Sequence, residues 1–383
     1  METFLLFLAA GTLLLYIAIS LEVTIGNRSI AFLKNVPPWE GDAPRLSIVI
    51  PARNEERNLE EALRSILAQD YPNVEIVVVD DRSTDRTGEI LDRMAAADPR
   101  LKVVHVTELP PGWLGKNHAL ELGSEGASGD FLLFTDADVV MEPTAVRRAV
   151  AHMEAKTLDH ITISPEILRT GLLYEMFIGT FALFFALYLK PWKVGNPRSS
   201  EHVGIGAFNL VRTAAYRAVG GHRPIALRPD DDLKLGKLLK KNGYRQEFLY
   251  GHGMLRVEWY ASIRELIQGL MKNAFPAVDY RVSVVILSTV AQLAWNVWPF
   301  LAVFLTTGAT RLVNVAICLL VLLLCAVNAP LAGVRRWYGL GFPLASLLFL
   351  YILWRSTVLI LWTGGIEWRG TRYPLAELKA NKV

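Results

Sequence analysis

Long apolar runs near both ends of the chain limit its fold more than any other feature of these 383 residues. The first run, residues 4–21, carries no charge and is close to the roughly 20 residues that cross a hydrocarbon core. Three more follow late, at residues 282–305, 312–331 and 341–363. A cleaved signal peptide is the alternative for the first run, which has neither a basic leader nor an A-x-A-like exit. We therefore expect membrane segments on both sides of a polar centre.

The same runs set the expected domain boundaries. We expect an amino-terminal transmembrane anchor, a linker, a catalytic domain, a membrane region and a basic tail, at residues 1–22, 23–45, 46–280, 281–363 and 364–383. Hydrophobic residues make up 52% of the chain, which is high for a soluble protein. The formal net charge is only +3, too balanced to indicate a nucleic-acid partner. Chemistry is expected in the polar centre.

Basic residues predict which side of the membrane the centre occupies. Arg28, Lys34 and Arg45 follow the first run, which favours a multi-pass protein of the plasma (inner) membrane with a cytoplasmic catalytic domain. Three late crossings would, however, export the basic residues of the tail. One late run is therefore expected to be re-entrant or interfacial, with Arg355 or Pro299 as its marker.

The polar centre alternates apolar β-branched runs with helical patterns. Its strands are expected at residues 46–52, 74–81, 101–106 and 130–138. Helices are expected between them, one capped by Asn54, one from about Asp85 to Ala97, and one starting near Lys116. Strands this apolar, each separated by a helix, predict an α/β fold whose parallel sheet is covered on both faces.

Ligands of such sheets bind at the carboxyl ends of the strands. The polar residues expected there are Pro51, Ala52, Arg53, Asn54 and Glu55 after the first strand, Asp80, Asp81, Arg82 and Ser83 after the second, and Asp136 and Asp138 after the fourth. Each cluster has a structural alternative, since Asn54 and Ser83 could cap helices. Glycine-rich phosphate loops do not match: GWLGKN and GIGAFN both fail the known patterns.

The stretch FTDADVV places two carboxylates one residue apart. At alternate positions of a strand, Asp136 and Asp138 would point to one face at the strand's exposed end. Like charges so close repel unless a cation lies between them. A hard divalent cation held together with a substrate phosphate is therefore expected.

The segment PARNEERNLEEALRSILAQDYPNVEIVVVDDRSTDRTGEIL, followed by FTDAD, resembles the family 2 inverting glycosyltransferases. The resemblance covers residues 47–273 and implies the GT-A nucleotide-diphospho-sugar fold. The flanking membrane runs narrow it toward members that act on lipids, such as ceramide glucosyltransferase and the bacterial enzymes that glycosylate hopanoids or carotenoids.

The resemblance implies a role for each matching residue. Asp81 would accept a hydrogen bond from the base, Lys116 would lie near the sugar diphosphate, and Asp136 with Asp138 would form the DxD site for Mg²⁺ or Mn²⁺. The remaining nucleotide-binding positions are Pro51, Ala52, Asn54, Glu55 and Ser83.

A second carboxylate cluster is expected to serve the acceptor. Inversion by direct displacement needs a base for the acceptor hydroxyl, and the family alignment makes Asp232 that base and Asp231 its neighbour. Crowding with Asp230 should raise the pKa of the base. The alternative is an acidic cluster that only stabilises a helix amino terminus.

The acceptor side departs from the family in one respect. Many relatives carry a (Q/R)xxRW motif, but Leu255 and Glu258 replace its basic positions and only Trp259 fits. That motif is associated with processive polysaccharide synthases, so its loss weakens the polymerase interpretation.

One apolar run, GLLYEMFIGTFALFFALYL at residues 171–189, lies inside the catalytic region. A single crossing there would place Asp232 and Asp138 on opposite sides of the membrane. We expect this segment to lie in the interface, with its phenylalanines facing lipid or the acceptor's apolar tail; they are Phe177, Phe181, Phe184 and Phe185. A buried core helix is the alternative.

Together these features predict a membrane-anchored, metal-dependent enzyme that transfers one sugar from a nucleoside-diphosphate sugar to a lipid acceptor, and UDP is the expected nucleotide. Two alternatives stay open: a processive polysaccharide synthase, and a nucleotide-binding membrane scaffold without turnover. Nucleic acid is not expected as a partner.

Overall fold

The structure is a computed structural model that describes residues 2–168, 171–368 and 370–382. Its contacts divide the chain into two compact units. One comprises Met1–Ser29, Arg169–Lys190 and Trp259–Leu375, and the other Ile30–Leu168, Pro191–Glu258 and Ala376–Val383. Each unit is described by itself below.

The second unit is built on a seven-stranded sheet in the order β3-β2-β1-β4-β8-β6-β9. Its strands are β1 (Leu46–Ala52), β2 (Val74–Asp81), β3 (Leu101–Val106), β4 (Phe131–Phe134), β6 (His160–Ser164), β8 (Asn209–Arg212) and β9 (Gln246–Tyr250). Only β8 runs antiparallel to its neighbours, β4 and β6. Strands β1 and β2 are buried almost throughout, as their continuous apolar sequence requires. The predicted mostly parallel α/β sheet is confirmed.

Helices connect these strands. They are α2 (Leu59–Leu67), α3 (Thr87–Ala97), α4 (Gly115–Glu125), α5 (Ala145–Ala155), α7 (Thr213–Ala218) and α8 (Asp231–Lys241). Helix α4 packs against β1 and β2. A smaller sheet orders β5 (Val139–Met141), β10 (Leu255–Val257) and β7 (Glu166–Ile167).

Two local predictions were wrong. Asn54 does not cap α2, because that helix begins at Leu59 and Asn54 adopts a left-handed backbone with φ 54°. Strand β4 ends at Phe134, so Asp136 and Asp138 lie in the turn before β5 and not at alternate strand positions.

The segment of residues 376–382 also belongs to this unit. It contains most of α14 (Leu375–Ala380), whose Leu378 is fully buried. The Asn381 side chain donates to the Pro224 carbonyl at 3.0 Å and accepts from the Leu227 N–H at 3.2 Å. Residues 376–382 are therefore fixed to the loop that precedes α8.

The first unit is helical. Its main helices are α1 (Glu2–Arg28), α6 (Leu172–Leu189), α9 (Ile263–Ala274), α10 (Val282–Gln292), α11 (Trp298–Leu305), α12 (Gly308–Asn328) and α13 (Phe342–Thr363). A π-helical turn at Leu293–Val297 joins α10 to α11. A hairpin of β11 (Gly365–Trp368) and β12 (Thr371–Pro374) follows α13. Among the described residues, five helical segments are long and apolar enough to cross a membrane, including the expected runs and α6.

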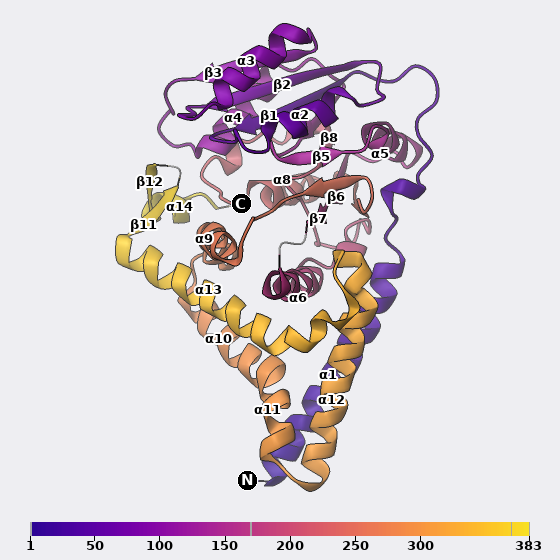
Figure 1. Ribbon diagram of the computed structural model, residues 1–383, viewed down its shortest axis with the longest axis vertical. Helices are drawn as coiled ribbons and strands as arrows, with labels where there is room; N and C mark the ends of the chain where they lie inside the picture. Colours follow the sequence, from indigo (N-terminus) through magenta and orange to yellow (C-terminus); the bar gives the residue numbers. More distant parts are fainter. Residues whose placement is uncertain (1, 169–170, 369, 383) are drawn as a thin grey trace. The chain divides into compact units, whose positions relative to one another are not determined.

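These helices form two groups within their unit. Helix α12 packs along α1 and against α11, and Figure 1 shows these helices side by side. Asn27 of α1 donates to Asn328 of α12 at 2.8 Å, and Tyr16 of α1 donates to Asn296 of the π-helical turn at 2.7 Å. Helix α13 instead packs against α6 and α9 and runs across the direction of α12 (Figure 1).

A buried carboxylate, Glu75, offers a test of the sheet. Burial would raise its pKa, but hydrogen bonds from Lys102, Ser47 and Ser128 lower it to about 2. A lowered pKa stabilises the fold above the unfolded value of 4.5, and this contribution is lost as pH falls toward 2.

We predict that Glu75→Gln lowers the free energy of unfolding by about 1.5–3 kcal/mol at neutral pH, because it weakens charge-assisted hydrogen bonds. Denaturant unfolding of the purified protein measures the change. The difference from wild type should shrink between pH 4.5 and pH 2. The exposed Glu89→Gln is the control, and an equal loss in both variants would contradict the assignment.

Candidate active site

The ammonium group of Lys116 lies between a carboxylate that follows strand β4 and a carboxylate at the amino terminus of helix α8. Lys116 belongs to the first turn of α4, and its Nζ is 2.8 Å from Oδ1 of Asp136 and 3.7 Å from Oδ1 of Asp231. Burial alone would lower the pKa of Lys116, but the surrounding carboxylates, Asp136 first, raise it above its ordinary value. Lys116 is therefore a fixed positive charge between two acidic elements.

The amino terminus of α8 supplies the second acidic element. Asp232 accepts hydrogen bonds from the Gly206 N–H and the Leu233 N–H, both at 2.7 Å. Burial raises the pKa of Asp231 to about 7 and also raises that of Asp232. Asp230 is bound differently, because its carboxylate pairs with Arg228 at 2.8 Å. Two of the three predicted carboxylates thus line the same cavity as Lys116 and Asp136.

The next residue, Asn117, fixes the loop before α8. Its amide donates to the carbonyls of Ile225 at 2.8 Å and Arg228 at 2.9 Å. Two consecutive residues of α4 therefore stabilise the site: Lys116 binds the acidic side chains, and Asn117 binds the backbone of the loop that leads to α8.

Two glycines of the GIGAFN stretch are required by this geometry, although sequence reasoning assigned them no role in the site. A Cβ on Gly206 would lie 2.6 Å from Oδ2 of Asp136 and 3.1 Å from the Lys116 ammonium. A Cβ on Gly204 would collide with the Asp232 carbonyl oxygen. A sequence pattern could have indicated their role: two glycines placed just before an apolar strand often mark a point where another part of the chain packs closely against the backbone.

Asp138 lies in a crowded acidic environment. Burial raises its pKa to about 7, and the nearby carboxylates of Asp136 and Glu55 add to the shift. The predicted repulsion between the two aspartates is therefore present. It follows from burial and a tight turn, and not from strand alternation.

The donor chemistry of these side chains fits a hard cation. Carboxylate oxygens are the ligands that Mg²⁺ and Mn²⁺ prefer, and Mg²⁺ usually takes only one or two from the protein. Within the described residues no group of three or more acidic, histidine or cysteine side chains could hold a metal by itself. A cation between Asp136 and Asp138 would therefore need further oxygen ligands, such as those of a diphosphate.

The loops after β1 and β2 are joined where nucleotide contacts were predicted. The Asn54 N–H donates to Ser83 Oγ at 3.0 Å, and the Thr84 N–H donates to Asn54 Oδ1 at 2.8 Å. The Glu55 N–H donates to Thr87 Oγ1 at 2.8 Å. Pro51 and Ala52 end β1 directly before these loops. The predicted nucleotide-binding positions thus form one continuous edge.

Asp81 is engaged by two arginines. Its carboxylate lies 2.7 Å from Arg82 and 3.5 Å from Arg53, and the residue is only 3% exposed. A nucleobase that donates to Asp81 would have to share or displace these guanidinium groups.

The predicted acceptor residues lie in the helical unit and do not form one cluster. The Trp259 and Phe181 rings are 5.1 Å apart, whereas Phe184 packs against Phe342 and Phe349 of α13. Phe177 was expected to face lipid, but it is 1% exposed because the unit packs around it. Phe181 and Trp259 are the pair that the fold brings together.

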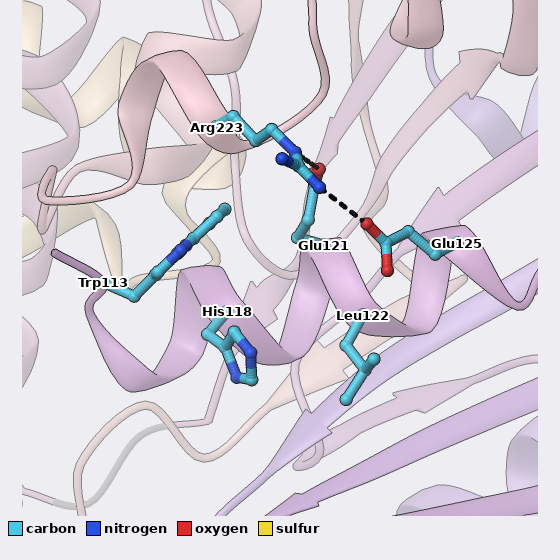
Figure 2. A pocket seen from close by; sticks show the side chains of 6 residues that line it. All are labelled: Trp113, His118, Glu121, Leu122, Glu125 and Arg223. Carbon is cyan, nitrogen blue, oxygen red and sulfur yellow. Dashed lines mark hydrogen bonds and ion pairs between the residues drawn. The ribbon is translucent and has the colours of Figure 1, made fainter. Parts of the chain in front are cut away.

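An open hollow is lined by residues of α4, by Trp113 and by Arg223. Figure 2 shows Arg223 reaching Glu121 and Glu125 beside it, with Trp113 and His118 on the other side. Glu121 also accepts from the His222 N–H at 2.9 Å, which ties this loop to α4. Burial lowers the pKa of His222 to about 3, so its imidazole is neutral at physiological pH.

Comparisons with known proteins find similarity to glycosyltransferases. Residues 47–218 match the family model described as Glycosyl transferase family 2. The 4,4'-diaponeurosporenoate glycosyltransferase of Staphylococcus haemolyticus is 29% identical over 61% of this chain and 62% of its own length. The probable glycosyltransferase YdaM of Bacillus subtilis is 36% identical over 30% of this chain and 28% of its own. Both matches span less than two thirds of the relative.

A solved structure shares the fold at low identity. The mannosyltransferase PcManGT from Pyrobaculum calidifontis, in complex with GDP-Man and Mn²⁺, superposes with a TM-score of 0.58 at 20% identity over 94% of this chain and 99% of that one. The sheet order, the acidic edge and these matches lead to one conclusion: residues 47–218 are a glycosyltransferase family 2 domain on a GT-A-type fold.

Proposed function

We propose that this protein is a membrane-anchored glycosyltransferase that moves one sugar, with inversion, from a nucleoside-diphosphate sugar to a lipid acceptor. The observation that carries the proposal is the meeting of Lys116, Asp136, Asp231 and Asp232 in one cavity beside the nucleotide edge. The name of the Staphylococcus haemolyticus relative, a carotenoid-acid glycosyltransferase, supports a lipid-like acceptor. A UDP-sugar is the proposed donor.

The donor end of the site neutralises a leaving diphosphate. Asp136 and Asp138 would hold a Mg²⁺ or Mn²⁺, which supplies charge neutralisation for the nucleoside diphosphate as it departs. Lys116 adds a compact ammonium whose position is fixed by Asp136. The loops of Asn54, Glu55 and Ser83 would bind the nucleoside, with Asp81 accepting from the base.

The acceptor end of the site supplies a base. Asp232 would take the proton of the acceptor hydroxyl as the new C–O bond forms at the sugar carbon, while the bond to the diphosphate breaks and its electron pair leaves with the nucleotide. The raised pKa of Asp232 suits this transfer near neutral pH. Asp231 is the second candidate, and its Oδ1 lies 3.7 Å from the Lys116 ammonium. A carboxylate acceptor would need no base.

The membrane placement rests on the sheet. Strand β6 precedes α6, and β8 and β9 follow it, yet all three belong to one sheet. A single crossing by α6 would separate them, so we propose that α6 lies in the membrane interface on the cytoplasmic side, with Phe181 and Trp259 near the acceptor's apolar part. Phe184 would support this surface from behind.

Incubating membranes with a panel of radiolabelled nucleotide sugars tests the function. One labelled sugar per lipid molecule is expected in the organic extract. Labelled polymer would establish the processive synthase instead. Nucleotide binding without any transfer, across the panel, would indicate a scaffold.

We predict that Asp138→Ala lowers transfer roughly 100-fold or more, because a fixed electrostatic contact to the leaving group is lost. It should also remove the Mn²⁺-dependent part of UDP binding, measured by calorimetry, while the melting temperature stays near that of wild type. The exposed Asp42→Ala is the control. Full activity in EDTA would refute the metal.

We predict that Asp232→Asn leaves donor affinity unchanged and lowers transfer to a hydroxyl acceptor about 100-fold or more. Because a raised pKa means that protons compete for the base, wild-type transfer should fall as pH drops through this pKa. Measuring kcat against pH for Asp232→Asn and Asp231→Asn identifies which carboxylate is responsible. Normal turnover by Asp232→Asn, with loss in Asp231→Asn, would reassign the base.

A further inference from the structure

The last part of the chain lies on the same side of the membrane as the catalytic sheet. Residues 376–382 belong to the unit that contains the sheet, and Asn381 is bonded to the loop of Pro224 and Leu227. If the chain is membrane-anchored as proposed above, residues 259–375 must cross the membrane an even number of times.

Three apolar segments lie in that interval: Val282–Leu305, Gly308–Ala332 and Arg336–Thr363. The first two form a helical hairpin, because α11 ends at Leu305, α12 begins at Gly308 and the two helices pack together. A hairpin crosses twice or not at all. In either case α13, the helix of the third segment, cannot cross alone.

The packing of α13 agrees with a helix that does not cross the membrane alone. It contacts α6 and α9 and lies across the direction of α12, as Figure 1 shows. Helix α6 is the other apolar helix that chain continuity prevents from crossing.

The outward stripe of α13 has the composition of an interfacial helix. Arg355 is exposed there, one turn from Tyr351, whose hydroxyl is 3.5 Å from its guanidinium. The exposed apolar residues of the helix are Leu344, Leu347, Val358, Leu359, Leu361 and Trp362. An arginine at the centre of a spanning helix costs about 2.5–3.5 kcal/mol, whereas at the interface it meets phosphate groups, and Tyr and Trp favour that depth.

We propose that α13 does not cross the membrane but lies along the surface on the catalytic side, where Arg355 contacts the phosphate groups of anionic phospholipids. The partner of this face is the lipid surface itself. This arrangement retains the basic tail on the cytoplasmic side, in agreement with the positive-inside rule. The proposal rests on membrane anchoring, and not on the identity of the sugar or the acceptor.

Cysteine labelling tests the topology. In a protein with Cys318→Ala and Cys325→Ala, single cysteines replace Thr307 in the hairpin turn and Lys379 in α14, both exposed. An impermeant thiol reagent applied to intact cells should label position 307 and not position 379, which should react only after the membrane is opened. Labelling of position 379 from outside would overturn the proposal.

Depth measurements test the orientation of α13. Nitroxide labels at positions 344, 351, 358 and 362 are compared in vesicles of phosphatidylcholine and phosphatidylglycerol, using relaxation by oxygen and by a water-soluble nickel complex. We predict that all four labels lie at the same shallow depth in the bilayer. A crossing helix would spread them over about 27 Å along its axis. The control is the exposed stripe of α12, at positions 312, 319 and 323, which should span about 16 Å.

The lipid contact of Arg355 has its own variants. Arg355→Leu should move the labels at positions 351 and 358 deeper, and Arg355→Lys should restore their depth. Unchanged depth in Arg355→Leu would refute the phosphate contact. Sugar transfer is assayed on the same cysteine-free protein, so that an inactive protein with the expected topology would refute the proposed function and leave this inference intact.

Discussion

The ion pair between Lys116 and Asp136 is the contact on which the candidate site depends. Without the ammonium, Asp136, Asp231 and Asp232 would place several negative charges in one partly buried cavity, where like charges repel. With it, the end of β4 and the start of α8 are held close together. The same helix turn carries Asn117, whose hydrogen bonds to Ile225 and Arg228 fix the approach to α8. One turn of α4 therefore sets both the charge balance and the backbone geometry of the cleft.

Sequence reasoning predicted the sheet because its strands are buried on both faces and read as continuous apolar runs. The carboxyl-edge rule then placed Asn54, Asp81 and Asp136 at one edge, where the structure also has them. It did not predict the turn of Asp136 and Asp138, because a four-residue strand cannot be distinguished from a longer one by periodicity. The arginine contacts of Asp81 and the tight approach at Gly206 depend on partners distant in sequence, so no local pattern contains them.

Hydropathy predicted the apolar helices, but it does not distinguish helices that cross a membrane from helices that lie on its surface. Helices α6 and α13 satisfy the same length and composition criteria as α12. In the topology proposed above, what separates them is connectivity: strands on both sides of α6 share a sheet, and residues on both sides of the α10–α13 region share a unit. Such constraints are global, whereas a hydropathy window is local. The expectation that Phe177 faces lipid was wrong for a related reason, since the burial of one helix face depends on helices far along the chain.

The clamp that Asn381 places on Pro224 and Leu227 has a consequence for the order in which the protein matures. The clamped loop leads directly to Asp231 and Asp232, yet its partner is synthesised after every apolar helix of the chain. During translation the loop must wait for residues 376–382, so the acidic edge acquires its final support only after the helices before it have left the ribosome. Completion of the candidate cleft therefore follows synthesis of the apolar helices that the structure describes.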